Sequence, residues 1–378
     1  MKKAVKITLA IAIPLIVTSS VVGILVNQYY INNNTRRLDQ AILSIMDEYM
    51  VPGLAVSAIT DSEIVWMNSY GYSNIEENIV VTENTLFMLG SISKSVISTA
   101  FMQLVEEELV ELDSNINAYL PFNICHPLYT NSSITPRMLL THTSGITDNG
   151  YVIYPKLTIG TDSPICLAEF IFNYLNENGS YFYYSNFNSE QPGTYYDYSN
   201  VGSTLVAYLI EVISNSTFEQ YCQENIFLPL GMENTSWFLS NLDVNDIAVP
   251  YEESYGYLYP ITHYSSPVYP CGFLRTSVLQ FSYFLMAIIN DGQYGEIELL
   301  HNSSVNLLTT IQLPAIAPNT GLFWQSDGEY WGHGGSAPGV STLMLFHPIR
   351  NEGVIVFTNG ENTEVTSIIL NEIFSMVW

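Results

Sequence analysis

Gly90-Ser91-Ile92-Ser93-Lys94-Ser95 is the stretch from which the organisation of the chain can be worked out. An apolar run with helical spacing follows it, which predicts a helix extending to about Glu107 with Ser91 in its first turn. A serine hydroxyl attacks an acyl carbon only with a base within hydrogen-bond reach. Lys94 lies one turn along the same face, and a helix N-terminus favours developing negative charge. Ser91 and Lys94 are therefore a candidate nucleophile and its proton acceptor.

This spacing alone does not establish catalysis, because Ser and Lys three residues apart occur by chance on many solvated helix faces. The pKa of Lys94 would also have to fall for its amine to accept a proton. We expect that fall if the amine is desolvated and held near positive or dipolar groups.

Composition restricts the kinds of protein to consider. With 378 residues, 48% of them hydrophobic and 13% aromatic, the chain can fill a large core in one or two domains. The net charge of −26 reflects a shortage of Lys and Arg (10) more than an excess of Asp and Glu (36). Such a surface repels phosphate backbones, which argues against a nucleic-acid partner.

The N-terminus has the pattern of a segment that enters a membrane. Residues 1–6 carry three lysines, and residues 7–26 carry no charge over a length that matches a bilayer core. We interpret 1–6 as cytoplasmic, 7–26 as an uncleaved signal anchor and 27–37 as a tether, with a cleaved signal peptide as the alternative. Both interpretations place residues 38–378, the expected domain, outside the cytoplasm, either membrane-anchored or secreted.

The cysteines show no metal-binding pattern. Cys125, Cys166, Cys222 and Cys271 form no C-x-x-C pair and no histidines cluster, so we predict no metal site. One or two disulfides and four buried thiols remain alternatives. Glycosylation sequons, which matter only in a host that glycosylates, begin at Asn33, Asn131, Asn178, Asn215, Asn234 and Asn302.

Strand patterns lie at both ends of the chain and helical patterns between them. Strands are predicted at 53–59, 64–67, 341–346 and 354–358, and helices at 38–50, 136–141, 166–177, 201–214, 217–227 and 364–377. The segment 109–120 ends at Pro121, a helix stop signal. The fold class is thus α+β: an antiparallel sheet built from both chain ends, with flanking helices and an inserted, mostly helical lobe.

Two further segments supply partners for Ser91. Tyr198 and Asn200 stand two apart in a loop ahead of an apolar helix, where a phenol can relay a proton and an amide can bind a carbonyl. A second Tyr-Ser-Asn, at 184–186, lacks both the Pro-Gly turn before it and the helix after it, so we discount it. The glycine-rich stretch 331–339 lets backbone approach a substrate, and an N–H there could hold an oxyanion together with that of Ser91.

Taken in order, these motifs resemble those of the serine β-lactamase and penicillin-binding-protein superfamily, in its class C-like branch of esterases, D-aminopeptidases and lactamase-related hydrolases. The resemblance extends from about Leu38 to the C-terminus. Beyond the three motifs, it includes a "LD…YLP" stretch at 112–121, a "LLTHTSG" stretch at 139–145 and a "PLGM..T" stretch at 229–235. It implies a β-lactamase-like fold.

The resemblance also implies roles for single residues. Ser91 is the nucleophile, Lys94 its proton acceptor and Tyr198 the second proton-transfer group. Asn200, His333 and Gly335 bind the substrate, and the backbone N–H groups of Ser91 and Ser336 form the oxyanion hole. His142 is structural, and no cofactor is required.

Two positions depart from the pattern of the lactamases. His333 stands where they carry a lysine, and a mostly neutral imidazole binds a substrate carboxylate only weakly. Cys271-Gly272-Phe273 replaces a run of small residues and glycines in one wall of the cleft. The first departure lowers the expectation of β-lactamase activity without removing the machinery for acyl transfer.

The sequence therefore predicts an exported serine hydrolase that acts through an acyl-serine on small esters or D-amino-acid-containing peptides, with β-lactams less expected. The alternative is a catalytically vestigial binding or scaffolding protein at the cell surface, which could be oligomeric. The expected partners are a small ester or peptide and, through the N-terminal segment, a membrane.

Overall fold

The computed structural model describes residues 36–378. The predictions for the N-terminal basic residues, the signal anchor or signal peptide, and most of the tether lie outside these residues, as does the sequon at Asn33. Within 36–378, no helix combines the length and the hydropathy needed to cross a membrane.

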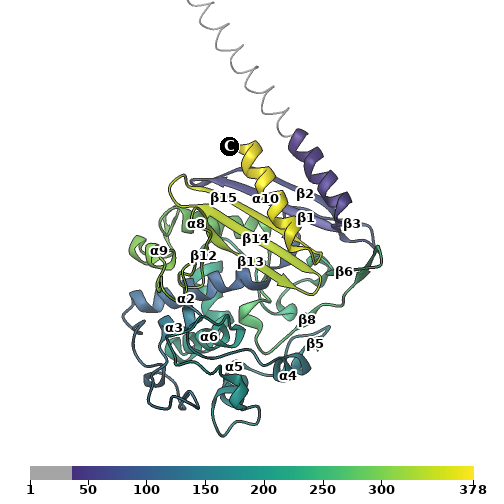
Figure 1. The fold of residues 1–378 in the computed structure, drawn as a ribbon. Helices are drawn as coiled ribbons and strands as arrows, with labels where there is room; N and C mark the ends of the chain where they lie inside the picture. Colours follow the sequence, from purple (N-terminus) through teal and green to yellow (C-terminus); the bar gives the residue numbers. More distant parts are fainter. Residues whose placement is uncertain (1–35) are drawn as a thin grey trace, which may run out of the picture.

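A seven-stranded antiparallel sheet is built from both ends of the described chain, as predicted (Figure 1). Its order is β12-β13-β14-β15-β1-β2-β3. The strands are β1 (Gly53–Thr60), β2 (Glu63–Asn74), β3 (Ile79–Val80), β12 (Gln325–Ser326), β13 (Trp331–Ala337), β14 (Val340–His347) and β15 (Glu352–Thr358). The predicted strands thus pair across almost the whole length of the chain, β1 with β15.

Strand β1 is buried on both faces and separates two layers of core. Leu54, Val56 and Ala58 point into a layer completed by α10 (Thr363–Val377) and a helix over residues 36–48. Figure 1 shows these two helices side by side on the sheet. The alternate residues Ala55 and Ile59 join the larger core, which continues into the helical lobe.

Helix α8 (Val278–Ile289) packs against β1 and β15 on the opposite face of the sheet, and the remaining helices continue from there into the helical lobe. They are α2 (Ser93–Glu106), α3 (Pro136–Leu140), α4 (Gly150–Ile153), α5 (Leu167–Leu175), α6 (Asn200–Ser214), α7 (Phe218–Cys222) and α9 (Asn302–Leu308). Two-stranded ladders join β4 (Leu86–Met88) to β9 (Arg275–Ser277), β5 (Thr158–Ile159) to β8 (Tyr264–Ser265), β6 (Tyr251–Ser254) to β7 (Tyr257–Pro260), and β10 (Gln293–Tyr294) to β11 (Ile297–Glu298).

Most predicted helices are confirmed within a few residues, and the differences have physical reasons. The segment 109–120 contains only the 3-10 turn Ile116–Ala118. Its buried side chains, Val110, Leu112 and Ile116, are separated by polar residues and do not form one continuous helix face. Helix α8 escapes prediction because its residues are apolar on nearly every side, which hides the helical period. The helix predicted to begin at Leu38 already includes residues 36 and 37.

All four cysteines are free thiols in this structure. Cys222 and Cys271 are buried, whereas Cys125 and Cys166 are exposed. The structure of residues 36–378 therefore shows neither disulfides nor four buried thiols, the two alternatives that the sequence left open. The five asparagines that begin sequons within the described residues are all exposed. Their glycosylation stays a prediction.

Strand β13 offers a matched test of how closely the sheet is packed. A Cβ on Gly332 would stand 1.9 Å from the Met344 carbonyl oxygen, whereas a Cβ on Gly334 would have 3.8 Å of clearance. We expect Gly332→Ala to lower the free energy of unfolding by about 1–3 kcal/mol, as overpacking does, and Gly334→Ala to leave it nearly unchanged. Urea unfolding of the two variants measures this. Equal midpoints would contradict the packing described here.

Candidate active site

Ser91 lies in a 3-10 turn, η1 (Gly90–Ile92), that leads directly into α2. The turn requires glycine at position 90, where φ is +55° and a Cβ would stand 2.8 Å from the Ser336 backbone nitrogen. The chain thereby brings Ser91 beside Ser336, on β13. These are the two residues whose N–H groups the sequence assigns to an oxyanion hole.

Lys94 is fully buried and points back at Ser91. Its Nζ donates to Ser91 Oγ at 3.1 Å, to Asn200 Oδ1 at 2.8 Å and to the Cys271 carbonyl oxygen at 2.8 Å. Three distant segments therefore converge on one ammonium group. Its position relative to the nucleophile is fixed by groups from both the helical lobe and the cleft wall.

The expected fall in the pKa of Lys94 is wrong for this structure. Burial alone lowers the pKa of the amine, but the neighbouring Tyr198 and Cys271 raise it by more, and Asp148 adds to the rise. The net pKa lies above the ordinary lysine value, because the amine faces acceptors and negative charge rather than other cations. A raised pKa favours the protonated amine, and Nζ has the three acceptors that an ammonium group can use.

Asp148 holds the other side of this network and was missed from the sequence. Its two carboxylate oxygens accept from the backbone N–H groups of Asn200 and Val201 at the start of α6 (both 3.0 Å), and from the Asn200 amide at 2.8 Å. A helix N-terminus favours such a carboxylate. Both ends of the Asn200 amide are therefore engaged by protein groups, and Asn200 connects Asp148 to Lys94. No motif around Asp148 indicates this role.

Tyr198 is packed between Lys94 and two histidines. Lys94 Nζ lies 4.9 Å from the centre of the phenol ring, and the rings of His142 and His333 lie 4.3 and 6.3 Å from it. The Tyr198 hydroxyl is buried and has no hydrogen-bond partner within residues 36–378. The hydroxyl oxygen is thus free to hydrogen-bond to a bound substrate. His142, expected to be structural, accepts from the Ser199 N–H at 3.2 Å.

His333 is buried and uncharged. Desolvation and the charge of Lys94 lower the pKa of its imidazole to about 4. Its Nδ1 lies 2.6 Å from the Gly334 carbonyl oxygen, an acceptor, which assigns the ring proton to Nδ1. Its Nε2 has no partner in the described part of the chain. The expectation of a neutral group at this position is therefore consistent with the structure.

The discounted Tyr-Ser-Asn at 184–186 lies away from Ser91 and supports a loop. Asn186 is fully buried, donates to the carbonyl oxygens of Tyr174 and Tyr181 (both 2.8 Å) and accepts from the Asn149 amide at 3.0 Å. It secures the chain next to Asp148. Its role is structural.

Two hollows meet at Ser91 and Ser336. The first is a cleft of about 310 Å³ whose walls are largely apolar side chains from 150–157 and 264–273. The second is a more open, polar depression that Tyr198 and His333 line together with the edge of β13. The nucleophile thus stands where an acyl group and a leaving group could lie on opposite sides. Residues 36–378 hold no group of three His, Cys, Asp or Glu placed to bind a metal ion.

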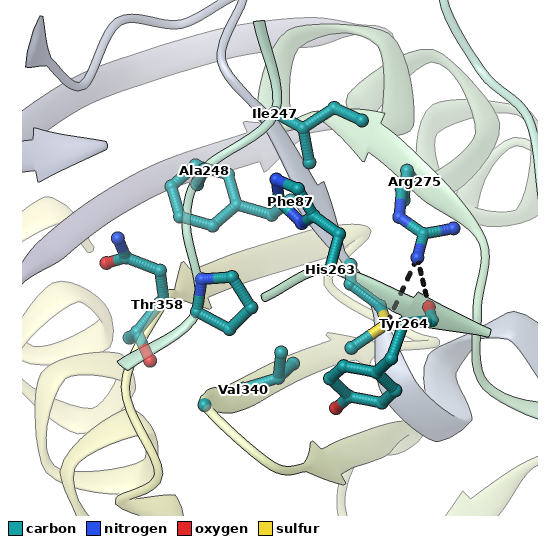
Figure 2. A pocket seen from close by; sticks show the side chains of 12 residues that line it. Phe87, Ile247, Ala248, His263, Tyr264, Arg275, Val340 and Thr358 are labelled. Atoms are coloured by element: carbon teal, nitrogen blue, oxygen red, sulfur yellow. Dashed lines mark hydrogen bonds between the residues drawn. The ribbon is translucent and has the colours of Figure 1, made fainter. Parts of the chain in front are cut away.

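The buried Arg275 donates hydrogen bonds to the backbone of the apolar wall, and Figure 2 shows it beside Tyr264, which belongs to that wall. Arg275 donates to the carbonyl oxygens of Trp237 at 3.0 Å, Phe273 at 3.1 Å and Tyr264 at 2.7 Å. No carboxylate of residues 36–378 lies within ion-pair distance of it. Arg275 borders a small cavity of about 10 Å³, room for about one water and too small for a substrate.

Comparison with known proteins identifies the family of this chain. The sequence profile described as Beta-lactamase matches residues 38–372. The putative penicillin-binding protein PbpX of Bacillus subtilis (strain 168) is 27% identical over 341 residues, which are 90% of this chain and 78% of PbpX. Protein flp of Staphylococcus aureus (strain MW2) is 22% identical over 344 residues, 89% of this chain. The chain spans 66% of the length of flp, slightly less than two thirds.

Solved structures share the fold. The octameric penicillin-binding protein homologue from Pyrococcus abyssi superposes with a TM-score of 0.71 at 24% identity, over 90% of this chain and 77% of that one. The hydrolase EstCE1, which has promiscuous acyltransferase activity, gives 0.72 at 18% identity, over 92% and 99%. The D-amino acid amidase from Ochrobactrum anthropi SV3 gives 0.70 at 20%, over 90% and 98%. With its profile match, its sheet and its Ser91–Lys94 pair in place, the chain belongs to the beta-lactamase family of proteins.

Proposed function

We propose that this protein is a serine hydrolase that hydrolyses neutral esters and amides of D-amino acids through an acyl-enzyme at Ser91. The observation that carries the proposal is the hydrogen bond of 3.1 Å between the buried Lys94 ammonium and Ser91 Oγ, at the junction of the two hollows. A binding or scaffolding protein would have no need to bury a lysine beside a serine in an open cleft.

The reaction would proceed in two acyl transfers. Ser91 Oγ attacks the carbonyl carbon, and the negative charge that develops on the carbonyl oxygen is held by the N–H groups of Ser91 and Ser336. The C–O or C–N bond to the leaving group then breaks. Water attacks the acyl-serine in the second step and restores Ser91.

Protons would move through Lys94 and Tyr198 as a pair. When Lys94 is an ammonium and Tyr198 a phenol, the pair has no site left for the proton of Ser91. The pair can accept that proton only after one of the two groups has lost its own. The pair is then either an ammonium beside a phenolate or a neutral amine beside a phenol, and the close approach of Lys94 to the phenol ring favours the oppositely charged pair, whose phenolate takes the proton of Ser91. The free Tyr198 hydroxyl then delivers the proton to the leaving atom on its own side of the cleft.

The charge around the cleft favours neutral substrates. No arginine and no lysine lines either hollow, and the chain as a whole carries −26. A substrate carboxylate would meet a neutral His333 and a negative surface potential. Esters and D-amino acid amides fit this environment better than β-lactams, which carry a carboxylate. Export through residues 7–26 remains part of the proposal.

Ser91→Ala should abolish both turnover and covalent labelling. The full-length chain and the variant would be assayed on p-nitrophenyl acetate, p-nitrophenyl butyrate and D-alanyl p-nitroanilide, with intact mass recorded after fluorophosphonate treatment. We expect a single adduct and a rate at least about 1000-fold above the variant for the best substrate, since the nucleophile itself is removed. A folded wild-type protein with neither turnover nor adduct would refute the proposed function.

His333→Lys should shift selectivity toward anionic substrates, because it places a permanent cation where the wild-type imidazole is neutral at pH 7. We expect kcat/KM for a carboxylate-bearing ester, relative to its neutral methyl ester, to rise about tenfold, and less at high salt. His301→Lys adds a lysine at an exposed histidine outside both hollows and is the control. An equal rise in both variants would show a general surface effect and contradict the assignment.

A further inference from the structure

We propose that the apolar hollow beside Ser91 is an acyl-chain subsite, and that the preferred substrates are neutral esters whose acyl group is an unbranched chain of about eight carbons or more. This inference rests on the proposed function and names its substrate class. It follows from which side the leaving group occupies, from the lining of the other side, and from an exposed apolar rim that continues it.

The position of Tyr198 decides the orientation of the substrate. When the tetrahedral intermediate collapses, the bond from the carbonyl carbon to the ester oxygen breaks, and that oxygen takes the proton that Ser91 gave up. The proton donor must lie beside the leaving oxygen. Tyr198 and His333 line the polar depression and are absent from the lining of the other hollow. The leaving alcohol therefore occupies the polar side, and the acyl group occupies the other.

The acyl side is lined mainly by apolar side chains, which include Ile153, Tyr154, Leu157, Val268, Phe273 and Ala337. Asn200 and Ser266 also reach it, and the Asn200 amide is already bound at both ends. The one ionisable carboxylate in its wall is Asp148, whose oxygens already accept four hydrogen bonds from the start of α6. That carboxylate is not free to bind a substrate ammonium, so among the substrates of the proposed function esters rank above D-amino acid amides, whose acyl group carries an ammonium. An alkyl chain gains from burial against the remaining surface.

An exposed apolar rim extends the same wall beyond the hollow. Within residues 151–159, Tyr154 is 73% exposed and Leu157 37%, and both also line the hollow. Next to them, Tyr151 is 96% exposed and Ile159 62%. Large apolar side chains gathered at the mouth of a cleft indicate a surface that ligands cover. The rim would carry the part of a chain too long for the hollow.

This rim is held in place from both sides. Ile159 pairs with Tyr264 in the β5–β8 ladder, and the Gly160 N–H donates to the His263 carbonyl oxygen at 2.6 Å. At the other end, the Asn149 N–H donates to the Tyr174 hydroxyl at 2.7 Å. The apolar side chains therefore project from a fixed segment, which suits a subsite.

The test is the dependence of kcat/KM on acyl length for the full-length chain. We would use p-nitrophenyl acetate, butyrate, octanoate and laurate below their micelle concentrations. Full burial of one CH2 group corresponds to roughly fourfold in kcat/KM. A partly open subsite should still give a rise of at least about tenfold from acetate to octanoate. A flat or falling series would overturn the acyl-chain subsite and leave the proposed hydrolase intact.

Charged substitutions locate the subsite. Leu157→Asp and Ile153→Asp should each lower the octanoate-to-acetate ratio of kcat/KM by about tenfold, since the added carboxylate faces the chain. Leu128→Asp makes the same change at a leucine that is 61% exposed and lines neither hollow, and it should keep the wild-type ratio. Equal ratios in all three variants would place the chain elsewhere.

Covalent labelling separates the two proposals. Ser91 would be labelled with the uncharged diesters ethyl p-nitrophenyl methylphosphonate and ethyl p-nitrophenyl octylphosphonate, and the rate of adduct formation measured by intact mass. Faster octyl labelling that is lost in Leu157→Asp supports the subsite even if deacylation of esters is slow. Labelling at equal rates refutes the subsite alone, and the absence of any adduct on Ser91 refutes the proposed function.

Discussion

The close approach of the Leu89–Gly90 backbone to strand β13 is the contact on which the site depends. A Cβ on Gly335 would stand 2.0 Å from the Leu89 carbonyl oxygen, and that oxygen accepts from Thr342 Oγ1 at 2.6 Å. Only glycine at 335 leaves room for this carbonyl, and only glycine at 90 leaves room for the Ser336 nitrogen. The first turn before α2 is thereby pinned to the sheet edge, and Ser91 and Ser336 become neighbours as a consequence. Gly335 therefore acts on the site through packing as much as through any contact with substrate.

The buried ammonium of Lys94 is the second constraint. A desolvated charge is unfavourable unless it is hydrogen-bonded, and this one has acceptors on η1, α6 and the 271 loop. Each acceptor is itself held: Asn200 by Asp148, and the wall that contains Cys271 by the carbonyl contacts of Arg275 with its neighbours. The charge is satisfied only when η1, α6 and the 271 loop are all assembled around it. A functional group thus also ties the helical lobe to the turn that carries Ser91.

Local signals in the sequence predicted local features well. The Ser91–Lys94 spacing, the hairpin of β1 and β2 and the helices α5 and α6 each depend on residues close in sequence, and the structure confirms them. Strand β13 was visible only as a glycine-rich stretch, since Gly332, Gly334 and Gly335 lack the branched side chains by which strands are identified. Asp148 and the raised pKa of Lys94 arise from contacts between distant segments, which no pattern of spacing displays.

In the proposed function, acyl transfer and substrate selection would be carried by different parts of this chain. The groups that would make and break the acyl bond lie on η1, α2, α6 and the backbone of β13, whose positions the core determines. Selection would fall to the imidazole at 333 and to the apolar segment 151–159. Because a neutral imidazole, an apolar wall and a net charge of −26 all disfavour carboxylates, three independent features favour the same neutral class. Relatives with the same fold can therefore differ in substrate without any change in the machinery around Ser91.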